Sequence, residues 1–136
     1  MKLSPITAGI IAAISLSLCI SLPASAMDEP EFTINRMVIS ERIAGKEPAA
    51  AADSFSADTE KVFCFLEATS IEQDTTVSFV WYFEGRETGR VTLPLKKGMR
   101  WRTYSSKKLG GLKGNWQVDL QEASGIVLNS VSFQVR

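Results

Sequence analysis

The amino-acid sequence predicts an all-β protein, a single antiparallel β-sandwich of immunoglobulin-like architecture that follows a cleaved signal peptide. Three observations lead to this prediction. About seven short runs rich in β-branched and aromatic residues follow one another after residue 31, and turn-forming residues separate them. No segment beyond residue 26 repeats its apolar residues with a helical period over ten residues or more. A small β-barrel is the alternative, because similar strands build either architecture.

Residues 1–26 have the organisation of a secretory signal. Lys2 supplies the positive start, the run from Ile6 to Leu22 is apolar or small, and Ala24-Ser25-Ala26 offers a cleavage pattern of small residues. The expected domains are therefore a signal peptide at 1–26 and one β-sandwich at 27–136, in a protein exported to the periplasm.

Two other fates of this leader remain open. The apolar run is long enough to serve as an uncleaved N-terminal anchor. Cys19 offers a site for a lipid anchor, although Leu18 before it is larger than the small residue that a lipidation motif requires.

The first strand is predicted at 32–39, where apolar residues alternate imperfectly. Residues 40–59 are predicted as a connecting loop, because Pro48 and Asp53 flank four alanines and restrict any helix there to one turn. The run 61–68 is apolar on both faces, which is typical of a strand in the middle of a sheet.

The clearest strand is predicted at 75–83, where Val77, Phe79, Trp81 and Phe83 recur with a period of two. We expect Trp81 to lie in the core, as the large aromatic residue of a mid-chain strand does in this architecture. Tight turns are expected at 84–86 and 96–98, on either side of a strand at 90–95.

The remaining strands are expected at 99–105, 116–120 and 126–135, with a glycine-rich loop at 109–114. The strand at 99–105 has two different sides. If Met99 and Trp101 face the core, Arg100, Arg102 and Tyr104 form a stripe on its outer side.

Several pieces of the second half of the chain form a pattern, namely Val80-Trp81-Tyr82 with Gly85, Trp101-Arg102-Thr103-Tyr104-Ser105-Ser106-Lys107, Gly114-Asn115-Trp116-Gln117-Val118, and Gly125-Ile126-Val127-Leu128 with Phe133. This pattern resembles the bacterial family known as domain of unknown function 2914, over about residues 36–135. The resemblance implies an exported or membrane-tethered β domain and no assigned activity. Val80 departs from the family pattern, which has a histidine at this position in many members, so chemistry that needs this histidine is not expected here.

The sequence contains no histidine, and after cleavage Cys64 is its only cysteine. Without imidazole there is no Ser-His-Asp or Cys-His arrangement, and no zinc site of the usual ligands. Cys64 lies in an apolar run and is expected to be buried. The motif Ser-x-x-Lys at 105–108 falls on an expected strand rather than on the helix that its catalytic use requires. We therefore predict no enzyme, no metal and no cofactor.

Charge is unevenly distributed along a chain that is nearly neutral in total. Residues 27–84 carry 12 acidic and 4 basic residues, whereas residues 85–113 carry 9 basic residues and only Glu87 as an acid. These charges either pair across neighbouring strands or leave a basic surface exposed.

The second possibility predicts a ligand-binding surface, whose candidate residues are Arg100, Arg102, Tyr104, Lys107 and Lys113. Its expected partner is an unidentified protein, a glycan or an anionic headgroup of the cell envelope. Membrane contact is compatible with this prediction but not required, and nucleic acid is not expected. The alternative function is a structural subunit that assembles through an edge strand, and an enzyme is a more remote one.

Overall fold

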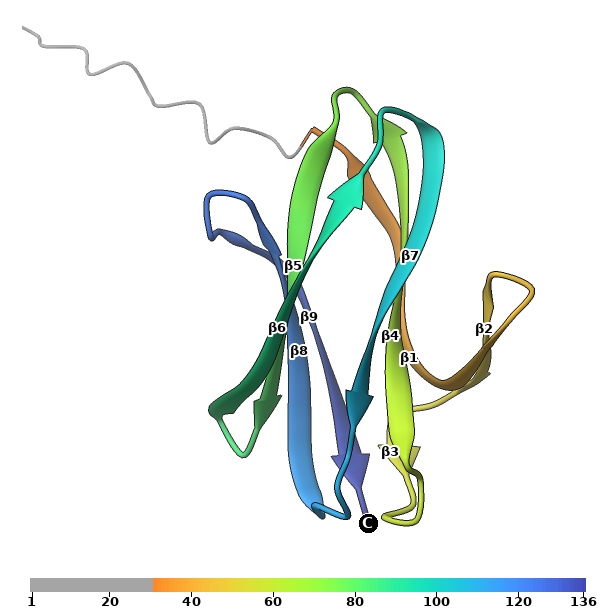
Figure 1. Cartoon of the computed structure of the whole chain (residues 1–136), viewed down its shortest axis with the longest axis vertical. Coiled ribbons are helices and arrows are strands. Elements are labelled where there is room, and N and C mark those ends of the chain that lie inside the picture. The colour runs from red at the N-terminus through yellow and green to blue at the C-terminus, as the bar shows by residue number, and fades with distance from the viewer. Residues whose placement is uncertain (1–30) are drawn as a thin grey trace, which may run out of the picture.

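The computed structural model describes residues 31–136, which form two β-sheets packed face to face (Figure 1). Sheet A has the strand order β2-β1-β4-β7, and sheet B has the order β3-β9-β8-β5-β6. The strands are β1 (Thr33–Ala44), β2 (Glu47–Ala51), β3 (Ser54–Phe55), β4 (Lys61–Ile71), β5 (Thr75–Phe83), β6 (Arg86–Leu95), β7 (Gly98–Lys108), β8 (Gly114–Glu122) and β9 (Val127–Val135). The predicted signal peptide, with its cleavage site and Cys19, lies outside the described residues.

The sandwich prediction is confirmed, because the two sheets remain separate and do not close into a barrel. β4 and β5, the two strands with the most apolar sequences, lie inside their sheets, whereas β7 and β6 form edges. All pairs are antiparallel except the short pair of β3 with β9, where Ser54 lies opposite Gln134. The boundaries of β5 coincide with the predicted strand 75–83.

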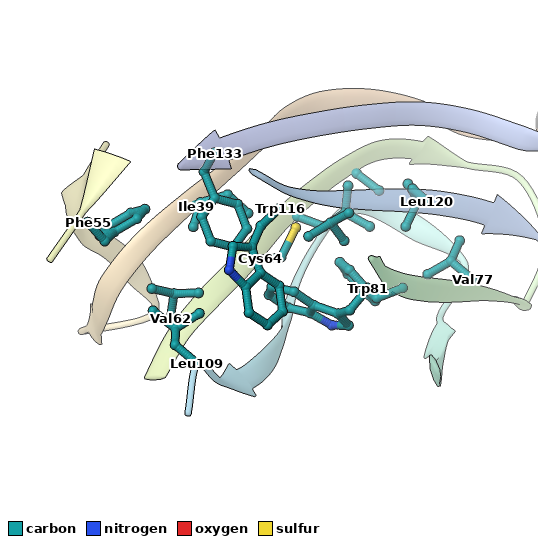
Figure 2. Close-up of a cluster of buried hydrophobic side chains, with 14 of the residues drawn as sticks. Ile39, Phe55, Val62, Cys64, Val77, Trp81, Leu109, Trp116, Leu120 and Phe133 are labelled. Carbon is teal, nitrogen blue, oxygen red and sulfur yellow. The ribbon is translucent and has the colours of Figure 1, made fainter. Parts of the chain in front are cut away.

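The core lies between the sheets and is rich in aromatic residues (Figure 2). Trp81 of β5 is 1 % exposed and, with Trp116 and Phe133, forms its largest buried group. The rings of Trp116 and Phe133 stack with centroids 5.9 Å apart. The expected burial of Trp81 and of Cys64 is confirmed, and Cys64 is a free cysteine.

The prediction of a plain loop at 40–59 is wrong. Gly45 and Lys46 have φ values of 56° and 64° and form a two-residue turn, after which β2 pairs back onto β1 with Ala44 opposite Glu47. Two central residues with positive φ produce the tight turn whose twist matches a β-hairpin. The alanines of β2 do not alternate between apolar and polar side chains. The sequence therefore carries no pattern that would reveal this strand.

The end of β1 and the whole of β2 form a hairpin arm, residues 40–51, that projects from sheet A at the right of Figure 1. β1 is longer than the predicted 32–39 because its second half builds this arm. Its first half contains a β-bulge between Ile34 and Arg36, where Asn35 is an additional residue. A bulge interrupts the alternation of side chains, which explains the imperfect sequence pattern of this strand.

Candidate functional site

An arginine cluster forms on the outer face of sheet A, the face opposite the core. It comprises Arg36 of β1, Glu67 of β4, Arg100 and Arg102 of β7, and Glu47 of the arm. The strand register places Arg36, Glu67 and Arg102 in one row across three neighbouring strands. Because neighbouring strands are about 4.8 Å apart, such a row brings opposite charges within reach of one another.

Glu67 is the centre of this cluster and its side chain is only 6 % exposed. Its carboxylate accepts hydrogen bonds from Asn35 Nδ2, from Arg100 Nε at 2.9 Å and from Arg36 Nη2 at 3.3 Å. The bulge in β1 explains how Asn35 and Arg36, adjacent in sequence, both reach the same carboxylate. The hydrogen bond from Asn35, followed by the hydrogen bond from Arg36 and the positive charges of Arg100 and Arg36, lowers the pKa of Glu67 below its ordinary value.

Glu47 connects the arm to the same cluster. Its Oε2 accepts from Arg36 Nη2 at 2.7 Å, and its Oε1 accepts from Arg102 Nη1 at 2.7 Å and from Arg100 Nη2 at 3.4 Å. Hydrogen bonds from Arg36 and Arg102 lower the pKa of Glu47. Hydrogen bonds to the carboxylates of Glu47 and Glu67 raise the pKa of Arg36. The hairpin arm is therefore attached to the sheet by charged hydrogen bonds from both β1 and β7.

The pairing expected across neighbouring strands therefore occurs for Arg100 and Arg102, whose partners come from the acidic first half of the chain. The cluster nevertheless contains three guanidinium groups against two carboxylates. Arg100 is 52 % exposed and Arg102 is 28 % exposed. One positive charge thus remains in excess at a surface that solvent reaches.

A groove of about 600 Å3, which we call the arm groove, lies beside the cluster. Ile43 and Lys46 of the arm form one wall, Phe65 of β4 contributes to the floor, and β7 forms the other wall with Arg100, Arg102 and Tyr104. Arg36 also lies over the Phe65 ring, 5.1 Å from its centroid, and this ring is almost fully buried although it faces away from the core. The arm groove thus combines an aromatic surface with cationic groups.

Three of the five predicted site residues come together. Arg100, Arg102 and Tyr104 share the outer side of β7, and all three line the arm groove. Lys107 lies on the other side of β7, where its Nζ donates to the Thr88 carbonyl of β6 at 2.8 Å. Lys113 is exposed in the loop after β7, which is about 20 Å from the arginines along the strand.

Met99 differs from the expectation that it faces the core together with Trp101. Trp101 packs against the core, but Met99 is 83 % exposed. Met99 lies at the start of β7, where its partner strand is irregular because Ser70 has a φ of 51° and leaves the ladder. The outer stripe of Arg100, Arg102 and Tyr104 therefore forms, although only Trp101, and not Met99, packs against the core.

Several members of the site were not predicted from the sequence, namely Arg36, Ile43, Glu47, Phe65 and Glu67. Alternation within 61–68 separates Phe65 and Glu67 from the core side, and this signal could have revealed them. The position of Arg36 in the cluster depends on the bulge in β1. The position of Glu47 depends on a hairpin that leaves no alternating pattern of side chains in the sequence.

Across residues 31–136, no three acidic or cysteine side chains gather in a way that would hold a metal ion. The same part of the chain contains no helix with the length and apolarity needed to cross a membrane.

Comparison with solved structures places the fold. The chain is similar to an immunoglobulin-like protein from Pseudomonas aeruginosa, with a TM-score of 0.54 and 14 % identity, over 77 % of this chain and 96 % of that one. A β-glucosidase from Kluyveromyces marxianus is 12 % identical over 57 % of this chain and 13 % of its own, with a TM-score of 0.43. One from Listeria innocua is 8 % identical over 77 % and 16 %, with a TM-score of 0.48. The first match confirms the immunoglobulin-like sandwich.

No curated protein matches the chain. A family model, described as "Protein of unknown function (DUF2914)", matches residues 74–135, which comprise β5 to β9. The resemblance of residues 36–73 to this family stays a prediction.

Several of the motif residues that lie within the matched range have structural roles. Ser105 accepts a hydrogen bond from Trp81, Trp116 is in the core, and a Cβ at Gly114 would collide with the carboxylate of Glu84. The motif therefore maintains the sandwich, whereas the arm with Glu47 lies outside the matched region. Residues 74–135 thus match the model of the family of proteins of unknown function designated DUF2914, and this match supports the resemblance predicted from the sequence.

Proposed function

We propose that this protein is an exported, non-catalytic binding module of the periplasm, and that the arm groove binds an anionic group carried by a larger apolar or sugar-like body. The observation that carries the proposal is the excess of arginine over carboxylate at the wall of this groove. Arginine binds carboxylate and phosphate groups with paired, charge-assisted hydrogen bonds.

The positions of the arginines support an anionic ligand over a cationic one. Arg102 uses Nη1 for Glu47, and Arg100 uses Nε for Glu67 and Nη2 for Glu47, so each guanidinium keeps at least one nitrogen for a ligand. Lys46 at the arm side of the groove adds another positive charge. Glu47 and Glu67 hold the arginines in place, so little side-chain order would be lost on binding.

The other surfaces of the groove support an apolar or sugar-like portion of the ligand. Tyr104 is 47 % exposed, and its ring packs edge-on against Phe63 with centroids 5.5 Å apart. Ile43 faces it from the arm side of the groove. Both a sugar ring and the glycerol part of a lipid headgroup can pack against such rings while their acidic groups reach the arginines.

The test measures binding to two anionic probes that come from different sources. The purified protein is sedimented with phosphatidylglycerol vesicles, with phosphatidylcholine vesicles as the neutral comparison, and is titrated with hexagalacturonate by calorimetry. Binding to phosphatidylglycerol alone identifies a headgroup, and binding to hexagalacturonate identifies an acidic glycan. Binding to neither overturns the proposal.

Variants locate the binding in the groove. Replacing Arg100 and Arg102 together by Ser should abolish binding, while replacing Arg86 and Arg90 of β6 by Ser removes the same charge elsewhere and should leave it intact. Lys46→Asn keeps a residue that tolerates positive φ and leaves the cluster untouched, so a loss of affinity there does not reflect misfolding. Unchanged binding in the double arginine variant contradicts the proposal.

The edge position of β7 favours a second function, assembly through strand addition. β7 has eleven residues without proline, and among the described strands it pairs only with β4. An open edge of this length can accept a strand from another chain. Sedimentation velocity should then show a size that grows with protein concentration, and a monomer at all concentrations would exclude self-assembly.

A further inference from the structure

The geometry points to a second binding site on the outer face of sheet B, which we propose binds an uncharged oligosaccharide. This site is a groove of about 820 Å3 that we call the polar groove. It lies on the opposite sheet from the arm groove and shares no residue with it. The proposal is therefore independent of the anionic ligand discussed above.

Six of the twelve residues that line the polar groove carry neutral hydrogen-bonding side chains. They come from alternate positions of adjacent strands, so that Tyr82 of β5, Gln117 of β8 and Ser132 of β9 form one row, with Asn115 and Gln134 in the next. Alternation places all of them on one face at spacings of about 4.8 Å between strands and about 7 Å along a strand. Such a surface presents donors and acceptors in a regular array.

Internal hydrogen bonds fix several of these side chains. Asp119 Oδ1 accepts from Gln117 Nε2 at 2.7 Å and from Ser130 Oγ at 2.6 Å. At the other end, Gln134 Nε2 donates to Asn115 Oδ1 at 3.3 Å, and Gln134 Oε1 accepts from Arg136 at 3.0 Å. Side chains already held in one conformation lose little entropy when a ligand binds.

These bonds leave several polar atoms available. Within residues 31–136, no hydrogen bond engages the Tyr82 hydroxyl, the Ser132 hydroxyl, Gln117 Oε1, Asn115 Nδ2 or Asp119 Oδ2. The set contains both donors and acceptors, and a sugar hydroxyl is itself both. A carboxylate or a fully deprotonated phosphate only accepts hydrogen bonds, so it offers no donor to the acceptors of this groove.

Charge and shape favour the same class of ligand. The charged side chains that line the polar groove are Asp53, Asp119 and Arg136, so the groove has no excess of positive charge to attract an acid. Tyr82 is half-buried and supplies an aromatic surface beside the amides, against which the C–H face of a sugar ring can pack. The groove is open and extends over β5, β8 and β9, so it can accommodate several linked sugar units.

The experiment uses the side-chain amide groups as direct reporters. Cellohexaose, maltohexaose and laminarihexaose are titrated separately into the 15N-labelled protein, up to millimolar concentration, and hexagalacturonate serves as the charged comparison. We expect at least one neutral hexasaccharide to shift the side-chain amide signals of Asn115, Gln117 and Gln134. The signals of Arg100 and Arg102 should stay in place.

Three variants complete the test. Gln117→Ala alters an exposed side chain and should weaken binding of that sugar at least tenfold, and Tyr82→Ala should weaken it further. Gln121→Ala removes an amide from the same face of β8 outside the groove and should bind as the unaltered protein does. No shift with any neutral sugar, or equal affinity in Gln117→Ala and the unaltered protein, would overturn the proposal. Neither result bears on the arm groove.

Discussion

Trp81 Nε1 donates a buried hydrogen bond to Ser105 Oγ at 3.0 Å, and this bond joins the two sheets through the middle of the core. Trp81 belongs to β5 of sheet B and Ser105 to β7 of sheet A. Both residues are almost inaccessible to solvent. The hydroxyl of Ser105 thus satisfies an indole N–H that water could not reach.

The first prediction follows from this pair. Ser105→Ala should destabilise the protein by about 1–3 kcal/mol, because it leaves the buried indole N–H without an acceptor. Urea unfolding followed by tryptophan fluorescence measures the change. Ser106→Ala, which alters the exposed neighbour, should change stability by no more than about 0.5 kcal/mol. Equal stability of the two variants would refute the importance of the bond.

The second prediction concerns Gly114, which has a φ of +145° and lies against Glu84. Gly114→Ala should cost about 1–3 kcal/mol, because it forces a side chain into a backbone region suited to glycine and displaces the Glu84 carboxylate from its hydrogen bond with the Asn115 amide. The same denaturation experiment measures it. Gly111→Ala also has a positive φ but open space around it, so it should be the milder change. The reverse order would show that the collision is relieved without cost.

The third prediction is a loss of stability in acid. The folded protein lowers the pKa values of Glu67 and Glu47 below 4.5, so the unfolded chain binds more protons than the folded one as the pH falls through 4.5. The free energy of unfolding that these two carboxylates contribute is present above pH 4.5. It is lost progressively as the pH falls from 4.5 through their lower pKa values in the folded protein. Melting temperatures recorded from neutral pH downward should therefore fall more steeply below pH 4.5 in the unaltered protein than in Glu67→Gln. Parallel curves would contradict it.

The fourth prediction concerns the arm. Glu47→Gln removes the charge that attaches the arm to Arg36 and Arg102, so amide exchange of residues 47–51 should accelerate at least tenfold while β4 and β8 stay protected. Hydrogen-exchange mass spectrometry measures both regions. Glu41→Gln is the matched control, because Glu41 belongs to the same arm and, within residues 31–136, forms an ion pair only with Arg42, at 3.6 Å. Equal exchange in both variants would mean that the backbone pairing alone holds β2.

The fifth prediction concerns thiol chemistry. Burial raises the pKa of Cys64, and the side chain is fully enclosed by the core. A maleimide reagent should therefore leave Cys64 unmodified in the folded protein for hours and label it within minutes in denaturant. Mass spectrometry of the peptide that contains Cys64 reports the result. Rapid labelling without denaturant would mean that the sandwich opens readily.

The core of this fold was predictable where side-chain alternation determines which face is buried. Val77, Phe79 and Trp81 recur with a period of two, and β5 was predicted with its correct boundaries. β2 and β3 were missed because their pairing depends on backbone geometry: a turn with two positive φ values in one case, and two residues beside β9 in the other.

The candidate site was only half predictable for a related reason. The outer position of Arg100 and Arg102 follows from alternation along β7. Their partners depend on the strand order, which brings Glu67 and Arg36 alongside, and on the arm, which returns Glu47 to the same place. Neither the order of strands in a sheet nor the direction of a hairpin can be read from local patterns of residues.

The internal position of Trp81, Ser105 and Trp116 has a consequence for proteins that match the same family model. Relatives that preserve these residues inherit a common scaffold, but the arm groove also needs Arg36, Glu47 and Glu67, which precede the shared region. Residues at those three positions can therefore change without disturbing the buried core. Relatives should be sorted by what they carry at those three positions before any common ligand is assumed.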